Sequence, residues 1–439
     1  MSIHWFEGLN TLPWNVHIAI VAGEYPPRWG GIGSVVYHLA KHFVDIGHEV
    51  SIITRKHSSA IPSQEGVKVI QVPWTPLPMA FTRSYGKNAK RALVKLHEKR
   101  PIDVIHAHLP LVSWTRREYR YLQRKIAPIV SSLHGSWLGE REGIRRAAYA
   151  KESAIWRNPN DTAILLTAKW YARYERAGIL ESAMCVANSQ STKKEFEQWY
   201  RPTPSFSCEV VLWGCDHLFF RPPNTDYEEE QQRHEEIREF YNCGDEDALS
   251  YLPTTQTPML LAVGRLVARK GYMTLLRAMP EIIRQHPSVV LVIVGRGHMK
   301  KSLLKEAKKL EIESSINIQS SLSFQDLAQH FRSADLVIYP SYYEGQGLIP
   351  LESLASGTPV ITVNQPPLTE MIDQSVGGLF EMGNPDDLAR VVCSTLSNVD
   401  RGIQAQKGRQ RILDNYTYEH NAEAFEAIFK KVISTTQTE

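Results

Sequence analysis

The chain has 439 residues, of which 43% are hydrophobic and 22% are charged, and its formal net charge is only +3 at pH 7. This composition predicts a globular protein of two or three domains and argues against nucleic acid as a partner. No run of 18 apolar residues occurs, so we expect no transmembrane helix. The five cysteines form no Cys-x-x-Cys pair, which favours a reducing compartment, the cytoplasm, and argues against a zinc site.

Short runs rich in Val, Ile and Leu predict the strands. Six lie in the first half, at residues 18–22, 50–54, 67–72, 104–107, 129–133 and 184–187. Five follow in the second half, at residues 259–263, 289–294, 316–319, 335–339 and 360–363. Helical patterns lie between them, for example at 35–46, 272–284 and 299–310. Because the runs are continuous rather than alternating, we predict α/β domains whose doubly wound parallel sheets are covered on both faces.

The alternation of strands and helices breaks between residues 214 and 255, where a proline-rich stretch precedes an acidic one. We therefore predict a first domain over residues 1–213 and a second over residues 214–415. The acidic stretch at 226–247 is typical of a solvated helix and linker.

The most informative stretch runs from residue 341 to residue 360. Glu344 and Glu352 are eight residues apart, and a glycine loop follows the first. An apolar strand precedes the loop and a helical pattern follows it, so free N–H groups should meet an anion there. The loop and helix start consist of Gly345, Gln346, Gly347 and Leu348. Carboxylates accept paired hydrogen bonds from vicinal hydroxyls, so anion donors beside carboxylates indicate a nucleotide-sugar site.

This element resembles the E-x7-E motif of retaining glycosyltransferases with the GT-B architecture, in which two Rossmann-like domains face a cleft. The group is described as glycosyltransferase family 4-like, or glycosyl transferases group 1, and it includes glycogen synthases and sucrose synthases. The resemblance implies a retaining hexosyltransferase, in which Glu344 holds hexose hydroxyls and Glu352 holds the ribose. It also implies that the last helix, within residues 416–439, crosses back to the first domain.

Three further motifs fit the resemblance. The glycine turn containing Gly31 and Gly33 follows the first strand, and in this family such a turn faces the donor diphosphate and the acceptor. His134 ends a buried strand at the position that contacts the donor hexose in this family. Arg265 and Lys270 follow another buried strand and match the family's diphosphate-binding pair, in which Arg offers a fork and Lys a point charge. Arg269, between them, is expected to face solvent.

Other positions are less informative. We expect His106 and His108 to point to opposite faces of their strand, with one packed and the other facing the cleft. Trp213, Cys215 and Gln346 depart from the family pattern near the sugar pocket, which leaves the identity of the donor open.

The resemblance implies no cofactor beyond a UDP-, ADP- or GDP-linked sugar, and no Asp-x-Asp motif stands at a strand end, so we expect no metal. The acceptor is not identified. Basic stretches at 83–100 and 114–125 fit an anionic membrane surface at the inner face of the membrane, an anionic soluble acceptor, or a solvated face. Other functions left open are a phosphorylase or sugar-nucleotide epimerase on the same scaffold, and a non-catalytic nucleotide-sugar-binding protein.

Overall fold

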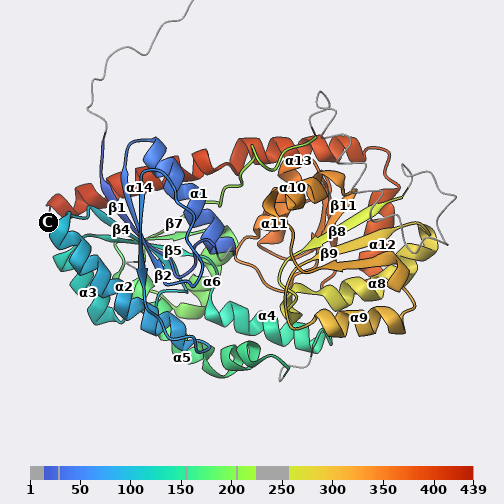
Figure 1. Ribbon diagram of the computed structural model, residues 1–439, viewed down its shortest axis with the longest axis horizontal. Coiled ribbons are helices and arrows are strands. Elements are labelled where there is room, and N and C mark those ends of the chain that lie inside the picture. Colours follow the sequence, from blue (N-terminus) through green and yellow to red (C-terminus); the bar gives the residue numbers. More distant parts are fainter. Residues whose placement is uncertain (1–13, 28–29, 154–156, 204–205, 224–256, 439) are drawn as a thin grey trace, which may run out of the picture.

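The computed structural model describes residues 14–27, 30–153, 157–203, 206–223 and 257–438. Two parallel sheets, each flanked by helices, form two lobes that lie side by side (Figure 1). The acidic stretch at 226–247 lies outside the described residues, and the boundary that we place at residue 213/214 stays a prediction.

The first sheet has seven parallel strands in the order β3-β2-β1-β4-β5-β6-β7. Successive strands are added toward one edge from β1 to β3 and toward the other edge from β4 onward. This strand order is that of doubly wound nucleotide-binding folds. Its strands are β1 (His17–Val21), β2 (Glu49–Arg55), β3 (Val67–Val72), β4 (Val104–Leu109), β5 (Ile129–Leu133), β6 (Met184–Ala187) and β7 (Cys208–Val210). Its helices are α1 (Gly31–Asp45), α2 (Ala80–Lys99), α3 (Arg116–Lys125), α4 (Trp137–Tyr149), α5 (Pro159–Glu181) and α6 (Gln190–Tyr200).

The second sheet has six parallel strands in the equivalent order, β10-β9-β8-β11-β12-β13. These are β8 (Met259–Val263), β9 (Val290–Val294), β10 (Ile316–Gln319), β11 (Leu336–Tyr339), β12 (Val360–Val363) and β13 (Gly377–Phe380). Its helices are η3 (Ala268–Lys270), α8 (Tyr272–Gln285), α9 (Lys300–Lys309), η4 (Glu313–Ser315), α10 (Phe324–Ser333), α11 (Leu348–Ala355), η5 (Leu368–Glu370), α12 (Pro385–Leu396) and α13 (Arg401–Asn415). The predicted α/β fold class, with two parallel-sheet domains, is confirmed.

The central strand β1 shows why the apolar runs form buried strands. All five of its residues are buried, and successive side chains point to opposite faces of the sheet. Ile18 and Ile20 join one core, whereas Ala19 and Val21 join the core on the other face. A strand covered on both faces buries nearly every side chain, so its sequence is mostly apolar, as it is over residues 18–22.

The last helix, α14 (Tyr418–Thr438), returns to the first sheet. Phe425, Ile428 and Phe429 are buried in the same core as Ile18 and Phe43 of the first domain. Figure 1 shows α14 along one edge of the first lobe, beyond α13 on the second. The chain therefore crosses between the lobes twice, once before β8 and once before α14.

Candidate active site

The loop between β11 and α11 carries the first predicted carboxylate. Gly347 precedes α11 with a φ of 106°, a conformation that side chains other than glycine rarely adopt. A Cβ on Gly345 would come 2.5 Å from the backbone oxygen of His134, so the first domain presses directly on this loop. The carbonyl of Gly345 accepts hydrogen bonds from the hydroxyls of Ser189 (2.7 Å) and Thr192 (3.0 Å). The loop is thus held from both domains.

Glu344 lies in an ion cluster. It pairs with Lys270 and accepts a hydrogen bond from Ser341 at 2.5 Å, and Nη1 of Arg269 lies 3.6 Å from Oε1. Burial alone would raise the pKa of Glu344, but Lys270 and Arg269 lower it to about 2. Glu344 is therefore a carboxylate at every ordinary pH.

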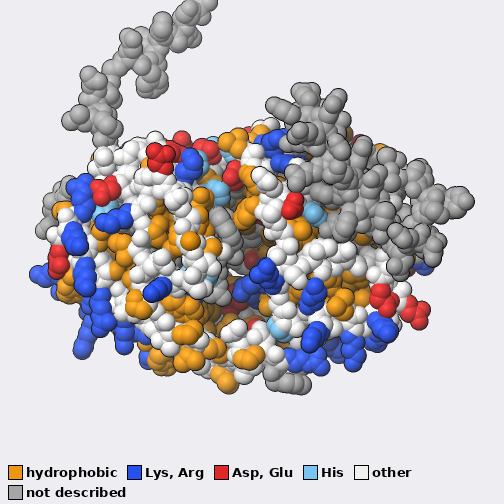
Figure 2. Space-filling view, in the orientation of Figure 1, with side chains coloured by type: hydrophobic (Ala, Val, Ile, Leu, Met, Phe, Trp, Pro, Cys, Tyr) orange, Lys and Arg blue, Asp and Glu red, His pale blue; other side chains and the backbone are white. Residues whose placement is uncertain are grey.

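Positive charge exceeds negative charge in this cluster. Burial, together with Arg269 and Arg265, lowers the pKa of Lys270 to about 8 although Glu344 opposes the shift. Arg265 is exposed, and among the described residues its guanidinium has no hydrogen-bond or ion-pair partner. Three basic groups face two acids, Glu344 and Glu140, so an anion would be stabilised here. Figure 2 shows the surface hollowed between the lobes, with basic side chains at the edge.

Arg269 does not face solvent, so that expectation was wrong. The residue is 8% exposed, and its guanidinium lies 2.7 Å from Glu140 of α4 in the first domain. It also donates to the backbone oxygen of Tyr343 at 3.2 Å. A buried guanidinium needs paired acceptors, and Arg269 finds them on both sides of the domain interface.

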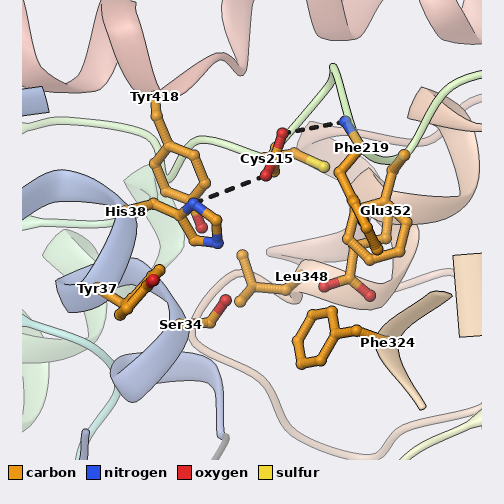
Figure 3. A pocket seen from close by; sticks show the side chains of 11 residues that line it. Ser34, Tyr37, His38, Cys215, Phe219, Phe324, Leu348, Glu352 and Tyr418 are labelled. Carbon is orange, nitrogen blue, oxygen red and sulfur yellow. Dashed lines mark hydrogen bonds and ion pairs between the residues drawn. The ribbon is translucent and has the colours of Figure 1, made fainter. Parts of the chain in front are cut away.

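The other predicted carboxylate lies in different surroundings. Glu352 and Leu348 line a cavity of about 200 Å³ between α1, α11, α14 and the connection after β7, whereas Glu344 does not line it. Figure 3 shows Glu352 and Phe324 on one side of this cavity and Ser34, Tyr37 and His38 on the other. Burial raises the pKa of Glu352 to about 7, and within the described residues its carboxylate has no partner.

The glycine turn of the first domain meets the second domain at this point. α1 begins at Gly31, and a Cβ there would lie 3.6 Å from the Trp213 ring and 4.0 Å from Leu348. Gly33 is buried inside the first turn of α1. The predicted glycines Gly31 and Gly347 therefore belong to helix starts that approach each other across the interface.

Three histidines form a row beneath the interface. The rings of His106 and His108 lie 4.3 Å apart, and His108 Nδ1 is 2.7 Å from His134 Nε2. The expectation of opposite faces was wrong, because residues two positions apart share a face of a strand. Burial lowers the pKa of His108 to about 3 and lowers the pKa of His106 and His134 as well, so all three are neutral imidazoles.

His134 retains one unused ring nitrogen. Its Nδ1 is buried and has no hydrogen-bond partner among the described residues, while its ring packs 4.9 Å from that of Trp213. No group of three or more His, Cys, Asp or Glu side chains arranged to hold a metal occurs in the described part of the chain.

Trp213 and Gln346, two of the residues that depart from the family pattern, are hydrogen-bonded to each other. The amide of Gln346 is 1% exposed, accepts from the backbone N–H of Trp213 at 2.7 Å, and donates to its carbonyl at 3.4 Å. Because its side-chain amide is bonded to Trp213, only the backbone of Gln346 is available to contact a nucleotide-sugar donor. The pair joins the glycine loop to the first domain where Trp213 also covers His134 and Gly31.

The fold and this site define a class of glycosyltransferase with two Rossmann-like domains. Residues 29–216 match the model of Glycosyltransferase Family 4, and residues 246–411 match that of Glycosyl transferases group 1. Together the two matches cover most of the chain, which belongs to the group 1 glycosyltransferases with a family 4 first domain.

Two curated relatives match this chain over nearly their whole length. An uncharacterized glycosyltransferase of Methanocaldococcus jannaschii is 28% identical, with 94% of this chain and 97% of the relative aligned. Glycogen synthase of Mycobacterium tuberculosis is 26% identical, with 94% of each chain aligned.

Solved structures share the fold. Sucrose-phosphate synthase of Thermosynechococcus elongatus superposes with a TM-score of 0.76 at 18% identity, covering 96% of this chain and all of that one. HepE of Anabaena, in complex with UDP-glucose, superposes with a TM-score of 0.65 at 16% identity, covering 97% of this chain and all of that one. Within the described residues, no helix combines the length and apolarity needed to span a bilayer.

Proposed function

We propose that this glycosyltransferase moves a hexose from a nucleoside-diphosphate sugar to an acceptor hydroxyl, with retention at the anomeric carbon. The carrying observation is the excess of basic groups around Lys270, beside a glycine loop that begins a helix. Arg265 has no partner among the described residues, and burial, together with Arg269 and Arg265, lowers the pKa of Lys270 despite the opposing effect of Glu344. A diphosphate supplies the missing negative charge. The Anabaena structure in complex with UDP-glucose supports a donor of this kind.

In the proposed reaction, the bond from the anomeric carbon to the phosphate oxygen breaks and a bond to the acceptor oxygen forms on the same face. The acceptor proton moves to the leaving diphosphate. Lys270, Arg265 and the backbone N–H groups of 345–348 stabilise the growing negative charge, and one such preorganised donor contributes about 3–4 kcal/mol to lowering the barrier. Glu344 holds hexose hydroxyls as a permanent carboxylate. His134 is assigned to contact with the hexose through Nδ1, which is buried and has no partner among the described residues.

The ribose is assigned to Glu352. Its carboxylate lines the interdomain cavity without a partner among the described residues, so two oxygens are free to accept from vicinal hydroxyls. The reaction as proposed uses no metal ion, because protein cations supply the charge compensation that a divalent ion supplies in other transferases.

The acceptor is proposed to be anionic or lipid-linked. Basic side chains gather over α2 and α3 (Figure 2), and the exposed ones include Lys87, Lys95, Lys99, Arg117 and Lys125. Two neighbours are partly compensated, since Arg116 and Arg120 share the single carboxylate of Glu181. The remaining cations suit peripheral contact with the anionic inner face of a membrane, at about 1 kcal/mol per basic residue near the surface.

The test is donor binding and hydrolysis over a panel of UDP-, ADP- and GDP-sugars, with and without liposomes containing anionic lipid. One preferred nucleotide sugar supports the proposal and names the donor, and stimulation by liposomes supports the membrane contact. Turnover with a sugar 1-phosphate in place of the nucleotide sugar would indicate a phosphorylase. Donor binding without transfer to any acceptor would indicate an epimerase or a non-catalytic protein.

A further inference from the structure

Tyr343, immediately before Glu344, belongs to the second domain but its ring lies in a groove of the first. Three glycines spaced by four residues, Gly135, Gly139 and Gly143, share one face at and before α4. A Cβ on Gly139 would overlap the Tyr343 ring, one on Gly143 would lie 2.5 Å from the Tyr343 Cβ, and one on Gly135 2.9 Å from the phenol oxygen. The ring therefore occupies the space that these three side chains leave empty.

The phenol hydroxyl of Tyr343 also acts as both acceptor and donor in hydrogen bonds with the first domain. Its oxygen accepts from the backbone N–H of Ser136 at 2.8 Å, and its hydroxyl donates to Glu195 of α6 at 3.0 Å. Ser136 Oγ donates to the same Glu195 oxygen. Ser136 and Glu195 both belong to the first domain, whereas Tyr343 belongs to the second. Tyr343 can therefore make these hydrogen bonds only when the two domains are closed.

The backbone on either side of Tyr343 is held by the same helices. Arg269 joins the Tyr343 carbonyl to Glu140 of α4, and the Gly345 carbonyl accepts from Ser189 and Thr192 at the start of α6. Figure 1 shows α4 below the gap between the lobes, and α4 packs against η3 of the second domain. Contacts from α4 and α6 therefore fix residues 343–345, and with them the place of the Glu344 carboxylate.

We propose that Tyr343 is a positioning residue that couples domain closure to assembly of the donor site. With the ring in the glycine groove, Glu344 and the N–H groups of the glycine loop face the donor. With the ring withdrawn, the loop loses its contacts with the first domain and the site is incomplete. The inference rests on the proposed function for its effect on catalysis, whereas its effect on closure is independent of the reaction.

The key variants are Gly139→Ala, which fills the groove without touching any proposed donor-binding group, and Tyr343→Phe, which keeps the ring and removes the hydroxyl. The matched control is Gly402→Ala in α13, where an added Cβ meets nothing within 4 Å. The measurements are the radius of gyration by small-angle X-ray scattering, the melting temperature, and kcat and KM for the preferred donor.

Gly139→Ala should enlarge the radius of gyration and lower kcat by at least tenfold, because the ring has no room in the groove. Tyr343→Phe should keep the wild-type radius and lose about fivefold in kcat, the effect of about one net hydrogen bond. Gly402→Ala should match the wild type in radius of gyration, kcat and KM, and should raise the melting temperature slightly because alanine favours a helix over glycine. Tyr343→Ala, which empties the groove, should repeat the effects of Gly139→Ala and serves if that variant does not fold.

Wild-type radius and kcat in Gly139→Ala, or in Tyr343→Ala where the first does not fold, would overturn the inference. So would a Tyr343→Phe variant as defective as Tyr343→Ala, since the ring would then contribute nothing. If the wild type turns over no nucleotide sugar, the proposed function fails, but the scattering comparison still decides whether Tyr343 controls closure.

Discussion

Replacing Glu152 by alanine should destabilise the contact between the two domains at the start of one helix, α8 of the second domain. Glu152 follows α4, and its carboxylate accepts from the backbone N–H groups of Met273 (2.8 Å) and Thr274 (2.9 Å) and from the Thr274 hydroxyl (2.5 Å). α8 has Gly271 as its N-cap residue, with no side-chain cap of its own. Glu152 is therefore the N-terminal cap of α8, supplied from 121 residues earlier in the chain.

The magnitude follows from the groups left without partners. Two N–H groups lose their acceptor, at about 1–3 kcal/mol each where they stay buried. A charge at a helix N-terminus contributes about 0.3–1 kcal/mol more. Burial raises the pKa of Glu152, so the wild type carries a desolvation cost that the variant escapes. We expect a net loss of about 2–4 kcal/mol, above the range of about 0.5–2 kcal/mol for removal of an ordinary N-cap, because Glu152 caps two N–H groups and a hydroxyl.

Hydrogen exchange measures this loss locally. The amides of Met273 and Thr274 should exchange about 30- to 1,000-fold faster in Glu152→Ala, the factor that corresponds to 2–4 kcal/mol. All ten tryptophans lie at or before residue 213, so tryptophan fluorescence monitors the first domain separately. Glu98→Ala, at an exposed site on α2, is the control. Unchanged exchange at the start of α8 in Glu152→Ala would refute the assignment of the cap.

Three further predictions concern the site. Because burial lowers the pKa of Lys270 to about 8, binding of UDP above pH 8 should take up a proton, seen by titration calorimetry in buffers of different ionisation enthalpy and lost in Lys270→Met. Burial raises the pKa of Glu352 from 4.5 to about 7. Ionisation of Glu352 therefore lowers the free energy of unfolding, and this loss grows as pH rises from 4.5 to 7. Glu352→Gln should therefore raise the melting temperature at pH 8 but not at pH 4.5; the same change at both pH values would contradict this. Addition of EDTA should leave transfer unchanged, and strong inhibition would contradict the proposed charge compensation by Arg265 and Lys270.

The fold was readable from the sequence because burial on both faces makes most positions of the central strands apolar, although β4 carries the buried His106 and His108. The edge strands β7 and β13 were missed: the first has three partly buried residues, and the second begins with two glycines. Neither carries the continuous apolar run that identified strands such as β1. In these two edge strands, pairing with a neighbour rather than hydrophobicity defines the strand, whereas the edge strands β3 and β10 were predicted from their apolar residues.

The site was readable only where its residues are close in sequence. The carboxylates and the glycine loop form one local motif, and Arg265 and Lys270 form another. Arg269 was assigned to solvent because its partner Glu140 lies in the other domain. The spacing of Gly135, Gly139 and Gly143 is visible in the sequence, but its meaning depends on Tyr343, some 200 residues later. Contacts between domains leave no local pattern.

The most direct test of the proposed function compares sugar transfer by the wild type with that of Lys270→Ala and Glu344→Ala, using the preferred donor. Each variant should lose about 10²- to 10³-fold in kcat, the effect of removing one preorganised transition-state contact. Circular dichroism should show that both retain the wild-type fold. If both variants transferred sugar at close to the wild-type rate, the cluster around Lys270 would not be the donor site.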